Sequence, residues 1–203
     1  MTYIDEQIAR KFKQERLKKQ EAENERKEKE AEALIDAEMV RDGILNGKCT
    51  VLDRQFTFAK YTVCKEHFSI WLPTENIEIQ NDEEDLFKSA NNELGFSCTI
   101  AATNDTSDFQ PLSVYKENMI NNMKKVSFKW LEEGAQLVDG YKVMYLDFIT
   151  LTGIVNVHQN MWFVAGPYGQ AQVVVNYDHA EAKYWKHMIE QIRNTFEIHT
   201  GQA

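Results

Sequence analysis

The chain has 203 residues, a hydrophobic fraction of 43% and a formal net charge of −9 at pH 7. This length fits one domain with an appendage, and the apolar content is sufficient for a packed core. The acidic balance disfavours a general nucleic-acid binder, because phosphate binding needs a surplus of Lys and Arg. No apolar run reaches the roughly 18 residues of a membrane span, and the start of the sequence lacks the apolar segment of a secretory signal. A cytoplasmic protein is therefore expected.

Residues 5–42 contain neither Gly nor Pro and consist mainly of strong helix formers, which predicts one long helix. Near its start, Ile4, Ile8 and Phe12 form a short apolar stripe. A second stripe, expected to dock on the following domain, comprises Ala31, Leu34, Ile35 and Met39. Charges of mixed sign disfavour a nucleic-acid or membrane arm, and the apolar heptads are too interrupted for a long coiled coil. Residues 1–43 are interpreted as an extended charged helix that carries an apolar contact surface, with a merely solvated helix as the alternative.

Beyond breaks at Gly43 and Asn46-Gly47, short runs rich in β-branched and aromatic residues predict antiparallel strands. The first strands are expected at 49–52, 55–63, 67–72, 86–89 and 95–103. A helix opening near Pro111 should turn four residues inward, namely Val114, Met119, Ile120 and Met123. Four more strands should centre on Leu131, 143–148, 154–164 and 171–177, with breaks that include Gly134. A last helix should span 180–196 and carry five residues on one side, Tyr184, Trp185, Met188, Ile192 and Phe196. Strands joined by short links ahead of helices predict an α+β domain over residues 47–203.

Four segments together resemble the PsbP-like fold family, over roughly residues 55–198. They are "HFSIWLPTENIEI", "FQPLSVYKENMINNMKK", "LVDGYKVMYLDFI" and "QAQVVVNYDHAEAKYWKHMIEQIRNTFEI". The family includes PsbP of photosystem II, the Ran-binding Mog proteins, the DcrB lipoproteins and the Eag-type secretion chaperones. The resemblance implies a twisted antiparallel sheet flanked by helices, an α/β/α sandwich, and a non-catalytic scaffold that binds protein surfaces. The N-terminal helix lies outside the family pattern.

The sequence contains no pattern that indicates an enzyme or a metal site. Its 5 histidines form no ligand motif. Asp178, His179 and Glu181 are better explained as the cap and first turn of a helix than as metal ligands. Neither a nucleophile elbow nor a phosphate-binding loop occurs, and the acidic run 82–85 is expected to be a solvated loop. The 3 cysteines are expected to be buried free thiols. No catalytic residue, cofactor or metal is therefore predicted.

Met161, Trp162 and Phe163 follow one another in an expected strand, so both faces of that strand are apolar. Either a helix covers each face, or one face is a binding surface for a protein. Two functions follow as hypotheses. The first is a non-catalytic chaperone or adaptor, possibly linked to secretion, that shields an apolar segment of a client protein. The alternative is a structural protein that forms homo-oligomers through its N-terminal helix. The predicted protein-binding residues are Ile4, Ile8, Phe12, Met161, Trp162 and Phe163.

Overall fold

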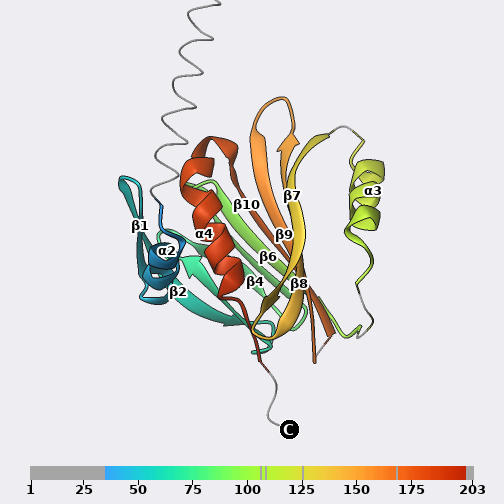
Figure 1. Ribbon diagram of the computed structural model, residues 1–203, viewed down its shortest axis with the longest axis horizontal. Coiled ribbons are helices and arrows are strands. Elements are labelled where there is room, and N and C mark those ends of the chain that lie inside the picture. The colour runs from blue at the N-terminus through green and yellow to red at the C-terminus, as the bar shows by residue number, and fades with distance from the viewer. Residues whose placement is uncertain (1–34, 106, 108, 125, 168, 200–203) are drawn as a thin grey trace, which may run out of the picture. The chain divides into compact units, whose positions relative to one another are not determined.

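The computed structural model describes residues 35–105, 107, 109–124, 126–167 and 169–199 (Figure 1). Two compact units are distinguished by their internal contacts, Met1–Asp36 and Ala37–Ala203. The predicted apolar stripe of Ile4, Ile8 and Phe12 lies outside the described residues, as does most of the predicted N-terminal helix. The architecture below is that of the second unit.

The second unit begins with helix α2 (Ala37–Leu45), which ends later than the predicted stop at Gly43. Gly43 lies inside the helix, and the backbone of Lys48 and Cys49 passes close against it. A Cβ at this position would stand 3.0 Å from the Cα of Cys49, so the glycine permits close packing rather than ending the helix. The inward face of α2 also differs from the prediction: Met39 is 73% exposed, whereas Val40 and Ile44 are buried.

The smaller of two sheets has four antiparallel strands in the order β1-β2-β3-β11. The strands are β1 (Lys48–Val51), β2 (Arg54–Val63), β3 (Phe68–Pro73) and β11 (Glu197–Ile198). The first three agree with the predicted runs, and Pro73 ends β3 as expected for a residue without a backbone N–H. The two-residue β11 was not predicted, since so short a strand has no pattern of its own.

The larger sheet has seven antiparallel strands in the order β4-β5-β6-β10-β9-β8-β7. They are β4 (Glu78–Asp82), β5 (Leu86–Asn91), β6 (Phe96–Thr103), β7 (Ser127–Val138), β8 (Tyr141–Leu151), β9 (Asn156–Gly166) and β10 (Gly169–Asp178). Sequence reasoning missed β4, a polar and mostly exposed edge strand. It was also wrong to place a break at Gly134, which lies within β7. A Cβ there would stand 2.8 Å from the Tyr145 hydroxyl, so the cross-strand ring needs the glycine.

The predicted α+β class with antiparallel strands is confirmed, and helices lie on both faces of the seven-stranded sheet (Figure 1). They are α3 (Leu112–Asn122), the short 3₁₀ turn η1 (His179–Glu181) and α4 (Ala182–Asn194). Figure 1 shows α4 on one side of the sheet and α3 on the other. In the described part of the chain, no helix is long and apolar enough to cross a membrane.

Helix α4 packs between the two sheets and forms the main core. The ring of Trp185 lies 5.3 Å from Phe56 of the small sheet and 4.8 Å from Phe96 of the large sheet. Phe196, just after the helix, stacks on Phe68 at 5.6 Å. The predicted inward face of this helix is confirmed, because all five of its residues are buried, Tyr184, Trp185, Met188, Ile192 and Phe196.

The predicted helix cap and the predicted thiols are also confirmed. The Asp178 carboxylate accepts a hydrogen bond of 2.9 Å from the backbone N–H of Ala180, which satisfies one of the free donors of the helix start. The free thiols Cys49, Cys64 and Cys98 are all buried. Burial raises the pKa of Cys49 and Cys64 to about 11, so both remain protonated and unreactive at neutral pH.

Candidate functional site

The face of the large sheet beneath α3 carries a compact apolar cluster. Leu146 and Phe148 of β8 alternate to this face, and the strand register places Leu146 opposite Met161 and Met144 opposite Phe163 of β9. We call Leu146, Phe148, Met161 and Phe163 the covered patch. Three of its members are at most 1% exposed and Met161 is 8% exposed. The patch is therefore shielded from water as thoroughly as the main core.

The edge strand β7 extends the patch with two stacked aromatic rings. Phe128 and Trp130 stack with 5.4 Å between centroids and a 14° interplanar angle. Trp130 also lies 5.0 Å from Phe148, so the aromatic surface continues from the buried patch to the sheet edge. Both rings are only partly buried. The rim of the patch thus stays accessible although its centre is covered.

Helix α3 covers the patch but buries little of itself. Leu112, Tyr115 and Met119 face the sheet, and the Tyr115 ring lies 4.2 Å from that of Phe163. No residue of α3 is buried, and Ile120, predicted to face inward, is 52% exposed. Met123, also predicted inward, is 39% exposed. The inward prediction was wrong for both, because the stripe that packs on the patch consists of Leu112, Tyr115 and Met119.

The local sequence of α3 adds little to its stability. The helix has 11 residues, fewer than the roughly 12–15 that a helix needs to be even marginally stable alone. Pro111 stands at the N-cap and makes no side-chain hydrogen bond to the free backbone donors. Half-buried contacts with the sheet hold the helix in place, among them those of Tyr115, whose pKa is raised by burial. Helix α3 is therefore a cover of low intrinsic stability on a strongly apolar surface.

The opposite face of the same strands carries a buried polar cluster. His158 Nε2 lies 2.7 Å from Asp147 Oδ1, and the His158 ring stacks on Tyr177 at 4.6 Å. The His179 ring is 5.7 Å from that of His158. Burial, then the neighbouring His158 and Lys129, lower the pKa of His179. Since His158 is 3% exposed, the cluster fits a buried polar contact where β8, β9, β10 and η1 meet rather than a site open to substrate.

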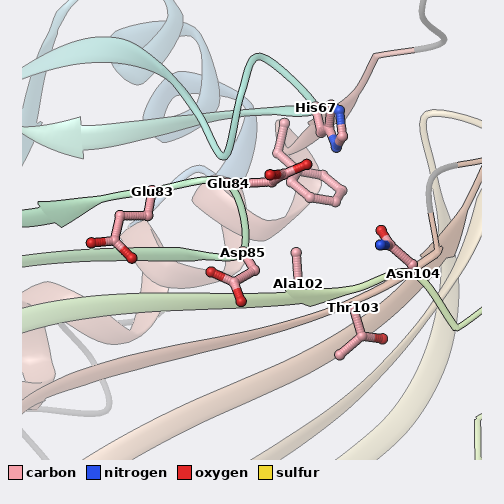
Figure 2. A pocket seen from close by; sticks show the side chains of 8 residues that line it. His67, Glu83, Glu84, Asp85, Ala102, Thr103 and Asn104 are labelled. Carbon is pink, nitrogen blue, oxygen red and sulfur yellow. The ribbon is translucent and has the colours of Figure 1, made fainter.

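A polar hollow of about 560 Å³ opens on another part of the molecule (Figure 2). Figure 2 shows Glu83, Glu84 and Asp85 of the β4–β5 connection facing the end of β6, near His67. These acids are exposed, and the Glu84 carboxylate accepts from the ammonium of Lys65 at 2.5 Å, which lowers its pKa. Residues 83–85 are thus a solvated connection, as predicted, whereas Asp82 of the same run ends β4. Exposed acids offer none of the desolvation that acid–base chemistry requires. Within the described residues, no group of three or more His, Cys, Asp or Glu could hold a metal ion.

The structure separates the predicted binding residues of β9. Met161 and Phe163 belong to the covered patch, whereas Trp162 points to the opposite face, is fully buried and lies 6.3 Å from Phe196 in the main core. A helix therefore covers each face of this strand, which was one of the two alternatives drawn from its sequence. Ile4, Ile8 and Phe12 lie outside the described residues. The protein-binding role of all six residues stays a prediction.

Sequence reasoning did not include Leu146, Phe148 and Trp130 among the candidate residues. The alternation in "KVMYLDFI" was a usable signal, since Met144, Leu146 and Phe148 share one face of a strand. Trp130 gave no such signal, because a β-bulge between Trp130 and Glu132 shifts the register of β7.

No protein-family model matches the sequence, and no curated protein matches it either. Among solved structures, the chain is similar to the cyanobacterial PsbP (CyanoP) of Synechocystis sp. PCC 6803, with a TM-score of 0.56 and 11% identity over 70% of this chain and 92% of that one. It also matches PA94 of Pseudomonas aeruginosa, described as a putative regulator, with a TM-score of 0.42 and 13% identity over 71% of this chain and 99% of that one.

A further match is the type VI secretion immunity protein TplEi of Pseudomonas aeruginosa, solved with an "L" peptide, with a TM-score of 0.42 and 9% identity over 74% of each chain. The last two TM-scores are too low to support an argument. The similarity to CyanoP shows the fold, and the PsbP-like fold expected from the sequence is thereby confirmed.

Proposed function

We propose that this chain with a PsbP-like fold is a non-catalytic protein-binding module that shields an apolar segment of a partner protein, as a chaperone or adaptor does. One observation carries the proposal: four deeply buried apolar side chains lie beneath a helix that buries none of its own residues. Exchanging this cover for a segment of another protein keeps the patch shielded from water. The fold by itself does not assign a function, so the proposal depends on this patch.

The patch is already buried beneath α3, so an exchange depends on how much apolar surface each cover buries of itself. Full burial of one Phe or Leu side chain of an incoming segment contributes about 1.5–3 kcal/mol. Helix α3 makes only half-buried contacts through Leu112, Tyr115 and Met119. A partner helix that packs more deeply can therefore compete, although it must overcome the high effective concentration of a tethered helix.

Two finer parts of the proposal concern location and the N-terminal segment. We place the protein in the cytoplasm, since buried free thiols suit a reducing compartment, and retain a link to secretion as part of the hypothesis. The apolar stripe of Ile4, Ile8 and Phe12 would contact either the partner or a second copy of this chain. Self-assembly through this stripe is the alternative function.

A matched pair of substitutions in α3 tests the proposal in the full chain. Met119 faces the patch and Ile120 faces solvent, so Met119→Asp should loosen the cover, whereas Ile120→Asp places the same charge on the outer face. The probe is a fluorescent amphipathic helical peptide of Leu and Lys. We expect Met119→Asp to bind it about tenfold more tightly than the wild type, and Ile120→Asp to bind it like the wild type.

Circular dichroism and urea unfolding first establish that both variants keep the folded domain. If the two folded variants bind the peptide equally weakly, the patch is only a part of the core and the proposal is refuted. If both bind more tightly to the same extent, the effect comes from the added charge, and the covered patch is again excluded as the binding surface.

A further inference from the structure

Helix α3 is attached to the sheet edge by a charged contact as well as by apolar ones. The ammonium of Lys116 lies 2.5 Å from the Glu133 carboxylate and 5.0 Å above the centroid of the Trp130 ring. The Lys116 side chain is only 23% exposed, whereas that of Glu133 is 50% exposed. A cation is thus held between a carboxylate and an aromatic face at the margin of the covered patch.

The β-bulge of β7 creates this arrangement. In a regular strand, residues three positions apart point to opposite faces, which would separate Trp130 from Glu133. Here Trp130 pairs with Phe148 and Glu133 pairs with Leu146, and the register shift lies between them. Phe148 and Leu146 are two residues apart, so they share the face of the patch. The extra residue of the bulge therefore turns Glu133 to the same side as Trp130.

Together Trp130 and Glu133 form what we call the cation subsite. It adjoins the patch, because Trp130 contacts Phe148 at 5.0 Å between centroids and Glu133 lies beside Leu146. Any helix that replaces α3 meets this subsite. Without a cation of its own, the replacing helix would lose the contacts with the Glu133 carboxylate and the Trp130 ring, which weakens binding.

We infer that the partner segment is an amphipathic helix of another protein whose apolar stripe fills the covered patch and whose Lys or Arg occupies the cation subsite. This inference rests on the proposed function. The resident helix shows the required pattern: Leu112, Tyr115 and Met119 lie on one face, with Lys116 beside them. The net charge of −9 further favours a basic segment over an acidic one during encounter.

Peptides copied from the resident helix test the inference. One peptide spans Phe109–Met123 and its twin carries Lys116→Gln. Both are titrated into the folded full chain that carries Met119→Asp, and into the same chain with Glu133→Gln added. We expect the Lys peptide to bind about five- to tenfold more tightly than its twin, from a cation–π contact and a partly exposed ion pair. With Glu133→Gln the difference should fall to about twofold, the part that belongs to the ring of Trp130.

The outcomes distinguish the inference from the proposed function. Equal binding of both peptides refutes the cation subsite and leaves the patch as a binding surface. Failure of both peptides to bind, together with failure of the Leu/Lys peptide, refutes the proposed function itself. A third peptide, residues 1–17, serves as competitor. If it displaces the Lys peptide at lower concentration, and does so equally well after Glu133→Gln, the occupant is the N-terminal segment of this chain, from the same or a second copy, and the separate partner is refuted.

Discussion

The two faces of the seven-stranded sheet are covered by helices of similar length but of very different attachment. Helix α4 has 13 residues, of which seven are buried, and it contacts both sheets. Helix α3 has 11 residues, of which none is buried, and it contacts one face of one sheet. The difference shows that α4 is part of the core, whereas α3 attaches to the sheet through one half-buried stripe. Binding sites are commonly drawn from such regions of low local stability.

The largest difference between the two helices is expected for one methionine in each, Met188 of α4 and Met119 of α3. Met188 of α4 is fully buried, so Met188→Ala should lower the free energy of unfolding by about 2–5 kcal/mol. Met119 of α3 is only half-buried, and Met119→Ala should lower it by less than about 1 kcal/mol. Urea unfolding followed by tryptophan fluorescence measures both values. Similar losses would show that α3 is as much a core element as α4, which would contradict the comparison.

The polar cluster on the α4 face should make that face sensitive to acid. The pKa of His179 is lowered by burial and by the charges of His158 and Lys129, with Asp178 opposing the shift, and Asp147 faces the same cluster through His158. Because the folded pKa lies below the unfolded value of about 6.5, the unfolded state binds the proton first as the pH falls. The contribution of His179 to stability is thus constant above about pH 7 and declines as the pH drops below about 6.5.

Replacement of His179 tests this directly. His179→Gln should reduce the loss of thermal stability between pH 7 and pH 5, measured as the shift in melting temperature, while Lys116→Gln on the α3 side should leave that acid response unchanged. An undiminished acid response in His179→Gln would show that another group of the cluster controls it.

The smallest effect is expected at the charged contact of α3. The Lys116–Glu133 pair is partly exposed, so its coupling energy in a double-mutant cycle of Lys116→Gln and Glu133→Gln should be about 0.2–1 kcal/mol and should decrease with added salt. The cycle is measured by urea unfolding at low and high ionic strength. A coupling insensitive to salt would indicate that the pair acts through packing on Trp130 rather than through charge.

Much of the fold could be predicted from local patterns. Alternation and turn residues located most strands within a few residues, and the spacing of Tyr184, Trp185, Met188 and Ile192 predicted the buried side of α4. Such predictions succeed because one periodicity determines both the element and its buried face. They failed at Gly43 and Gly134, where a neighbouring strand or ring needs the missing side chain and no local signal distinguishes packing from a turn.

The candidate site was predictable only in part. The run Met161, Trp162 and Phe163 indicated a strand with two apolar faces, but not which residue meets which helix. The pairing of β9 with β8 brings Leu146 and Phe148 to the side of Met161 and Phe163, and sends Trp162 to the main core. A single strand carries no information about its neighbours, so the composition of the patch depends on long-range pairing.

By itself, the sequence determined that this protein has an α+β domain with an antiparallel sheet and a last helix with one apolar face, since these follow from composition, periodicity and turn chemistry. Only the tertiary structure decided that α4 lies in the core and α3 on its margin, and that a bulge turns Trp130 and Glu133 to the same side of the sheet. The physical reason is that burial and register are properties of pairs of elements, which form only when distant parts of the chain come together.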